Sequence, residues 1–119
     1  MPNKLKEVLK PNLKPEALLT IRFGTTEGRF LGPGRVELLE RITETGSINK
    51  AAKAMKMSYK KAWEMIHDMN EQCKEPLVIS KSGGEDGGGT QVTEQCLLLI
   101  KEYKELVEEI RAFADSKLR

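Results

Sequence analysis

The sequence has little of the chemistry on which metal centres and many enzymes depend. Its 119 residues include one histidine, His67, and two cysteines, Cys73 and Cys96, which stand far apart and outside any CxxC motif. A zinc site takes three or four such ligands, so the sequence predicts neither a metal centre nor a cofactor. No nucleophile–base pair and no carboxylate pair in an evident pocket setting indicates an enzyme. The two thiols are expected to be reduced and packed.

Long apolar runs are also missing. No stretch approaches the roughly 18 apolar residues of a membrane span, and no apolar segment of a secretory signal follows the N-terminus. Hydrophobic residues make up 39% and charged residues 32% of the chain, a balance typical of globular domains and not of disordered ones. We therefore expect a cytoplasmic protein with no membrane partner.

The net charge is only +2, but its distribution is uneven. The segment 46–61 carries five lysines and no acidic residue: Lys50, Lys53, Lys56, Lys60 and Lys61. A local positive patch on a nearly neutral protein is what contact with phosphate requires. A solvated lysine face accounts for the charge equally well, so charge alone leaves both interpretations open.

Length and pattern predict a mainly α protein with a little β structure. We expect a loose polar arm over residues 1–17, with room for one helical turn, and a single domain over residues 18–119. Within that domain the patterns predict, in order, a β-hairpin at 18–31, helices at 33–45, 48–55 and 59–72, a second hairpin at 77–93 and a long helix at 94–116.

Single residues mark the ends of these helices. Pro33 suits a first helical turn, because its missing N–H would be unsatisfied there in any case. Gly46 ends the first helix, and Ser47, Ser58 and Thr93 are positioned to cap the three helices that follow. The apolar residues expected to face inward are Val36, Leu39 and Ile42, then Ile48, Ala51, Ala52 and Met55, then Ala62, Ile66 and Met69.

Two short helices joined by a tight turn form a DNA-binding helix-turn-helix, and the hairpin after them adds a wing. The second helix enters the major groove, and its first turn reaches phosphates and base edges. The capped start of the first helix offers N–H groups to a phosphate. An ordinary helical corner in another small fold is the alternative. The predicted DNA contacts are Ser47, Lys50, Ser58, Tyr59, Lys60, Lys61 and Glu64, with Lys81 and Thr90 at the base of the wing.

Four stretches in this order resemble one family of regulators. They read GPGRVELL at 32–39, GSINKAA at 46–52, MSYKKAW at 57–63 and GGEDGGG at 83–89. The second stretch is similar to the opening of the helix-turn-helix in LysR-type and ModE-type regulators, and the third is similar to the ModE-type recognition helix. The resemblance covers about residues 18–110. It implies the N-terminal DNA-binding domain of a molybdate-responsive regulator, which in that family is a dimer.

The chain departs from that family in two places. It ends after the last predicted helix, so we expect no molybdate-binding C-terminal domain, and the resemblance does not transfer oxyanion sensing; the small-molecule effector is unknown. Glu85 and Asp86 place two negative charges at the tip of the predicted wing. Phosphate repels such a tip, which disfavours insertion into the minor groove and leaves the residues at its base as plausible backbone contacts.

Two apolar stripes run along the predicted last helix. Cys96, Ile100, Tyr103, Val107, Ile110 and Ala114 form a heptad-type seam, and Leu99, Leu106 and Phe113 recur every seven residues. One stripe can pack on the helix's own domain while the other meets a partner. A monomer in which residues 18–31 cover the second stripe is the alternative. The sequence predicts a homodimer with an interface formed by Leu99, Ile100, Tyr103, Leu106, Val107, Ile110 and Phe113.

Two ring side chains besides Tyr59 lie on the predicted recognition helix. Trp63 falls beside Ala62 and Ile66, which favours packing against the first helix over contact with a base, and His67 is expected on the helix surface. Taken together, the sequence predicts a winged helix-turn-helix transcription regulator, not an enzyme, that binds double-stranded DNA sequence-specifically. A winged-helix module that binds protein is the alternative.

Overall fold

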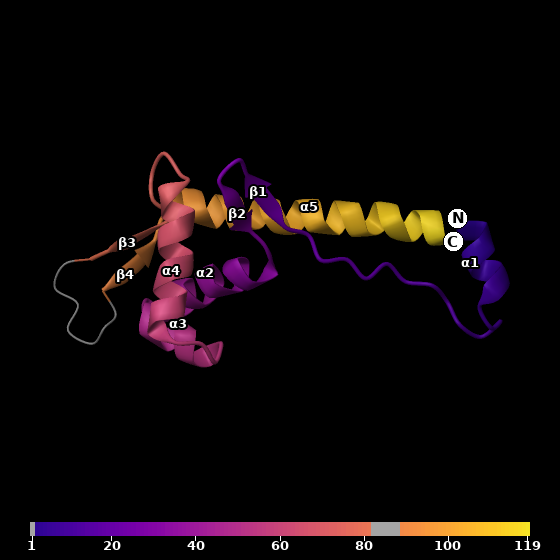
Figure 1. The fold of residues 1–119 in the computed structure, drawn as a ribbon, viewed down its shortest axis with the longest axis horizontal. Helices are drawn as coiled ribbons and strands as arrows, with labels where there is room; N and C mark the ends of the chain where they lie inside the picture. Colours follow the sequence, from indigo (N-terminus) through magenta and orange to yellow (C-terminus); the bar gives the residue numbers. More distant parts are fainter. Residues whose placement is uncertain (1, 82–88) are drawn as a thin grey trace. The chain divides into compact units, whose positions relative to one another are not determined.

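The computed structural model describes residues 2–81 and 89–119. It confirms a mainly α winged helix-turn-helix with two small antiparallel hairpins. The elements in chain order are α1 (Pro2–Val8), β1 (Phe23–Thr25), β2 (Gly28–Leu31), α2 (Pro33–Thr45), α3 (Ile48–Ala54), α4 (Tyr59–Glu71), β3 (Val78–Ser80), β4 (Thr90–Val92) and α5 (Glu94–Leu118) (Figure 1). The wing residues Glu85 and Asp86 lie outside the described residues.

The chain divides into two compact units, which are described separately: residues 21–100, and residues 1–20 with 101–119. In the smaller unit α1 has seven residues, longer than the single turn expected there. The amide of Ala17 donates to Asp115 Oδ1 at 2.9 Å, which ties the N-terminal arm to the end of α5. The arm is therefore held at this point by a specific hydrogen bond.

The core of the larger unit lies where α2, α3 and α4 pack on one another (Figure 1). The side chains that α2 and α4 were predicted to bury are buried, and Leu38 joins them at 0% exposure. On α3 only Ala51 and Ala52 are buried, and Ile48 and the C-cap residue Met55 are half-buried. Apolar residues spaced three and four apart share one face of a helix, so this face is what sequence periodicity predicts well.

The predicted helix ends in the helix-turn-helix are confirmed. Gly46 adopts the left-handed conformation with φ at 67°, and its N–H donates to Ile42 O at 2.7 Å. Ser47 Oγ accepts from the Lys50 amide at 3.1 Å, and Ser58 Oγ accepts from the Lys61 amide at 3.0 Å. The two serine bonds satisfy amides that the first turn of a helix leaves without partners.

Thr93 precedes α5 as predicted, but its hydroxyl does not act as the expected cap. The hydroxyl donates to the carbonyls of Pro76 and Leu77, both at 3.1 Å. The backbone carbonyl of Thr93 accepts the first helical bonds from Cys96 and Leu97. The side chain was wrongly assigned because its bonds go to residues 16 and 17 positions away, which local sequence does not indicate.

The first hairpin is shorter than predicted. Its strands begin at Phe23, which pairs with Leu31, and residues 18–22 form no strand. Pro33 begins α2, so β2 cannot extend further and has no residue to pair with 18–22. The predicted second hairpin is confirmed, with Val78 opposite Val92 and Ser80 opposite Thr90.

The two cysteines are packed thiols, as expected. Cys96 is fully buried, and this burial together with nearby Cys73 raises the pKa of Cys96 to about 12. Cys73 is half-buried, and burial raises its pKa as well. A raised pKa keeps a thiol protonated at neutral pH, so neither cysteine has the thiolate character of a reactive site.

The turn of the helix-turn-helix holds a lysine in the left-handed conformation. Lys56 has φ at 57°, and the bonds around it, Met57 N–H to Ala52 O and Lys56 N–H to Lys53 O, form a Schellman motif. The left-handed conformation raises the free energy of a residue with a Cβ by roughly 1–2 kcal/mol, whereas glycine adopts it without this strain.

We expect Lys56→Gly to raise the free energy of unfolding by about 0.5–1 kcal/mol, because relief of this strain exceeds the added freedom of the unfolded chain. Urea unfolding monitored by circular dichroism measures the change. Lys56→Ala is the matched control, since it removes the same charge but keeps the Cβ. Equal stability of the two variants would contradict the role of strain.

Candidate nucleic-acid interface

The outer side of α4 carries a continuous set of polar and aromatic side chains. Ala62, Ile66 and Met69 point into the core with at most 5% exposure. Most of the remaining positions of α4 are exposed, whereas Met65 and Asn70 are half-buried. Tyr59 and Trp63 keep 52% and 45% of their surface. We call this surface the recognition face; its members are Ser58, Tyr59, Lys60, Lys61, Trp63, Glu64 and His67, all exposed.

The five lysines of segment 46–61 are all exposed. Three lie on α3 and in the turn after it, and two lie on the first turn of α4. Within residues 2–81 and 89–119, the ion pairs join other residues and leave these five ammonium groups unpaired. An unpaired, solvated ammonium group is available to a phosphate without first breaking a bond within the protein.

Ser47 is the one predicted DNA contact that the fold buries. Its side chain is 1% exposed, and Oγ accepts from the Lys50 amide. Its own amide donates to Thr45 Oγ1 at 3.2 Å. Ser47 therefore shapes the junction between α2 and α3 and has no side-chain surface to offer a phosphate, whereas Lys50 on the next turn is exposed.

Trp63 lies on the recognition face and is not buried against α2, which corrects the sequence-based expectation. The core face of α4 is set by residues 62, 66 and 69, and residue 63 falls beyond the edge of that stripe. The indole stacks on the His67 imidazole one turn later, with ring centroids 4.8 Å apart and planes 7° from parallel. His67 is exposed, as expected, and supports the indole.

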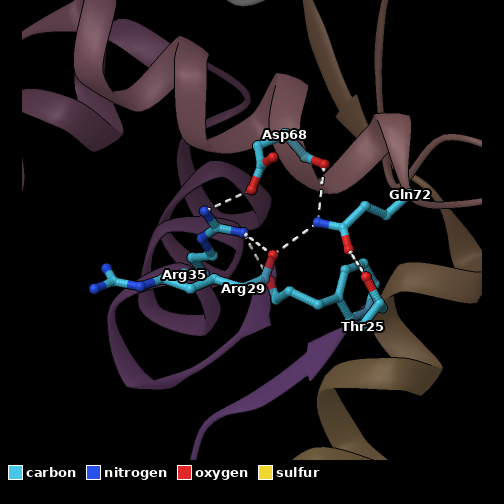
Figure 2. Close-up of polar contacts among 6 residues, drawn as sticks. Thr25, Arg29, Arg35, Asp68 and Gln72 are labelled. Carbon is cyan, nitrogen blue, oxygen red and sulfur yellow. Dashed lines mark hydrogen bonds and ion pairs between the residues drawn. The ribbon is translucent and has the colours of Figure 1, made fainter. Parts of the chain in front are cut away.

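A polar network joins α4 to α2 and to the first hairpin (Figure 2). Arg35, near the start of α2, pairs with Asp68 on α4 at 2.7 Å and donates to the carbonyls of Arg29 and Phe30 at 3.1 Å. Gln72 Nε2 also donates to the Arg29 carbonyl, at 2.7 Å, and the Thr25 hydroxyl donates to Gln72 Oε1. The network fixes the orientation of α4, and nothing in the local sequence pattern indicated it.

Asn70 makes a second link, from α4 to the start of β3. Its Oδ1 accepts from the amides of Leu77 and Val78 at 2.8 and 3.4 Å, and its Nδ2 donates to Val78 O at 3.0 Å. Leu77 and Val78 are 3% and 6% exposed, so water cannot reach their backbone groups, and the side-chain amide of Asn70 supplies the hydrogen bonds instead. Sequence analysis did not single out Asn70.

The base of the wing is attached to the helix-turn-helix. The amide of Thr90 donates to Gly46 O at 3.3 Å, and the Lys81 amide donates to Gly89 O, which closes the two strand ends on each other. Lys81 is exposed and Thr90 is half-buried. Both predicted contacts at the wing base therefore lie on the same unit as α4, with Lys81 the more accessible of the two.

The stripes of α5 differ in exposure. Ile100 and Tyr103 are buried within the chain at 7% and 8% exposure, and Val107, Ile110 and Leu99 are half-buried. Leu106 and Phe113 keep 40% and 65% of their surface. The Leu99, Leu106 and Phe113 stripe is thus the more open of the two and the better candidate for contact with a second subunit.

Neither a metal centre nor a membrane span is found within residues 2–81 and 89–119. No group of three histidine, cysteine, aspartate or glutamate side chains there is arranged to hold a metal ion. No helix in that part of the chain combines the length and apolar character that a membrane crossing requires.

The fold and its exposed helix define a winged helix-turn-helix of the DNA-binding type. The chain belongs to the bacterial regulatory helix-turn-helix proteins of the lysR family, whose sequence profile matches residues 34–97. This match begins in α2 and ends in the first turn of α5, so it spans the helix-turn-helix and the wing.

Individual relatives confirm the resemblance to ModE-type regulators. The chain is 41% identical to the molybdenum transport protein ModE of Azotobacter vinelandii over 98 residues, which is 82% of this chain and 36% of that protein. It is 41% identical to the transcriptional regulator ModE of Haemophilus influenzae over 99 residues, 83% of this chain and 38% of that protein. The DNA-binding transcriptional dual regulator ModE of Escherichia coli is 36% identical over 96 residues, 81% of this chain and 36% of that protein. The chain thus spans little more than a third of the length of these relatives.

Proposed function

We propose that this chain binds double-stranded DNA and regulates transcription in the cytoplasm, where the chromosome lies. The observation that carries the proposal is the recognition face, an exposed helix surface that includes Lys60 and Lys61. Three more exposed lysines lie on α3 and in the turn after it, and none of the five forms an ion pair within the described residues. A helix of this kind fits the major groove, which is about 12 Å wide and 8.5 Å deep. The lysR-family membership and the ModE-type relatives support the same interpretation.

In the proposed complex the charged and polar groups have separate tasks. Lys50, Lys60 and Lys61 neutralise phosphates, which releases counterions and supplies sequence-independent affinity. Tyr59 and Glu64 lie on the groove-facing surface of α4 and act on base edges. Ser58 presents its exposed hydroxyl at the start of the helix, and Lys81 and Thr90 contact the backbone beside the wing.

We infer that the regulator is a homodimer formed through the open stripe of α5. Two protomers related by a two-fold axis would place two recognition helices on half-sites about one helical turn apart. The names of the relatives connect them to molybdenum transport and to transcription, so we infer target genes for molybdenum supply or use. Selection of genomic fragments bound by the purified protein tests both inferences. An operator with two half-sites supports the homodimer, and the location of the operator identifies the target genes.

Replacement of Lys60 or Lys61 by alanine should weaken binding to such an operator roughly tenfold at moderate salt. The slope of log K against log salt should shrink by about 0.9 for each phosphate that is no longer neutralised, hence by about 1.8 in a dimer. Fluorescence anisotropy at several salt concentrations measures both. Lys74→Ala is the control, because Lys74 is exposed but follows the far end of α4. An unchanged slope would remove these lysines from the interface.

A further inference from the structure

The exposure of Trp63 is not explained by the stability of the fold. A tryptophan in a core contributes a large buried area, yet 45% of Trp63 remains accessible while its neighbour Ala62 is fully buried. The stack on His67, with planes 7° apart, holds the indole in one orientation. Trp63 and His67 thus form a stacked aromatic platform on the exposed surface of α4.

A small hollow of about 110 Å³ adjoins this platform. Trp63, Ile66 and His67 line it from α4, and Val78, Ile79 and Thr90 line it from the wing strands. Ligand pockets for drug-sized or nucleotide-sized molecules span about 300–1,000 Å³, so the hollow is too small for an effector of that kind. It has room for a group the size of a methyl, and its lining includes the apolar side chains of Ile48, Trp63, Ile66, Val78 and Ile79 beside the polar side chains of His67, Asn70, Ser80 and Thr90.

Charge decides which kind of partner supplies that group. Lys60 and Lys61 lie on the same exposed surface of α4 and are unpaired within the described residues. An aromatic platform next to ammonium groups complements a surface on which apolar groups lie next to anions. The major groove has this pattern, because phosphates border it and thymine projects a C5-methyl group into it.

We propose that Trp63, held in place by His67, contacts a thymine methyl group in the major groove and so contributes to operator specificity. This inference rests on the proposed function and assigns a specificity-determining residue to it. Trp63 touches the base, and His67 is a positioning residue that acts through the indole. The lysines supply affinity that does not depend on sequence, and the platform favours a T·A pair at one position of each half-site.

The test replaces thymine by uracil, which removes the methyl group and keeps the Watson–Crick and groove hydrogen bonds. The probe is a duplex of about 30 base pairs selected by the purified protein from a random-sequence pool. Each thymine in one half-site is replaced in turn, and anisotropy gives the affinity ratio. Burial of one methyl group predicts a loss of about fourfold at the contacted position.

Two variants assign that loss to the platform. In Trp63→Ala the uracil effect at this position should fall to about one, and overall affinity should drop, while the salt slope remains unchanged. His67→Ala should reduce the uracil effect in part, and His67→Phe should restore it because a phenyl ring can stack on the indole. Leu97→Ala is the matched control, since Leu97 is an apolar side chain with the same 45% exposure on α5; its uracil profile should match that of the parent protein.

The outcomes separate this inference from the proposed function. If the parent protein selects no duplex, the proposed function fails and the inference fails with it. If it selects a duplex but no thymine is sensitive to uracil, or if Trp63→Ala keeps the parent uracil profile, only the inference is overturned. Circular dichroism of each variant ensures that only folded protein is compared. A Trp63→Ala variant that binds DNA with the affinity of the parent protein would likewise overturn the inference.

Discussion

Asn70→Ala should lower the free energy of unfolding by about 3 kcal/mol, a large part of the stability of a domain of this size. The substitution removes all three hydrogen bonds that the side chain makes to the backbone of Leu77 and Val78. Both residues are nearly inaccessible to water, so the freed amides have no replacement partner. Urea unfolding of the parent and the variant gives the difference.

Asn49→Ala provides the matched control for this prediction. It is the same substitution on the neighbouring helix α3, but Asn49 is exposed and its amide is solvated. Its stability should change by no more than about 0.5 kcal/mol. If Asn70→Ala were equally mild, the hydrogen bonds to β3 would not be what holds the wing strand against α4. A large effect would identify Asn70 as the residue that couples the recognition helix to the wing.

The elements that sequence predicted well are those governed by short-range pattern. The buried stripes of α2 and α4 follow from helical periodicity, and the caps at Gly46, Ser47 and Ser58 follow from the local demands of helix ends. The same logic placed the lysines of the recognition face on the surface. A residue's neighbours within four positions are sufficient for each of these predictions.

The features that sequence missed depend on residues distant in the chain. Gln72 bonds to Arg29, 43 positions away, and Thr93 donates to Pro76, 17 positions away. Such partners are chosen by tertiary packing, which no local window contains. Ser47 illustrates a different error. Its role as a helix cap was predicted correctly, but a capping side chain that is buried cannot also contact DNA, and the predicted contact ignored this.

Trp63 shows why side-chain identity alone can mislead a prediction of burial. Large aromatic residues are usually buried, so the sequence favoured a core position, but the structure leaves 45% of the Trp63 surface exposed. The rule that large apolar side chains are buried is expected to fail at a binding surface, because binding requires exposed groups that the stability of the fold alone would bury. The Leu99, Leu106 and Phe113 stripe of α5 is a second apolar surface with exposed members, and there the sequence predicted contact with a partner subunit.

Introduction of charge into that stripe should have the largest effect on DNA binding. The double variant Leu106→Glu, Phe113→Glu places two carboxylates where two subunits are proposed to meet, and a desolvated carboxylate without a partner is strongly unfavourable. We expect the protein to become monomeric at micromolar concentration. Affinity for a two-half-site operator should then fall by about a hundredfold or more, because the second recognition helix is no longer tethered to the first.

Analytical ultracentrifugation gives the oligomeric state, and anisotropy at fixed salt gives the affinity. Ala112→Glu is the control for Phe113→Glu: it adds the same charge at the adjacent exposed position of α5, about 100° around the helix, and should leave the dimer intact. The monomeric variant should also bind a single half-site as well as one protomer of the parent does, with a salt slope near half that of the dimer, because each protomer carries its own lysines. A parent protein that sediments as a monomer and still binds both half-sites tightly would overturn the dimer and leave the recognition face as the sole source of affinity.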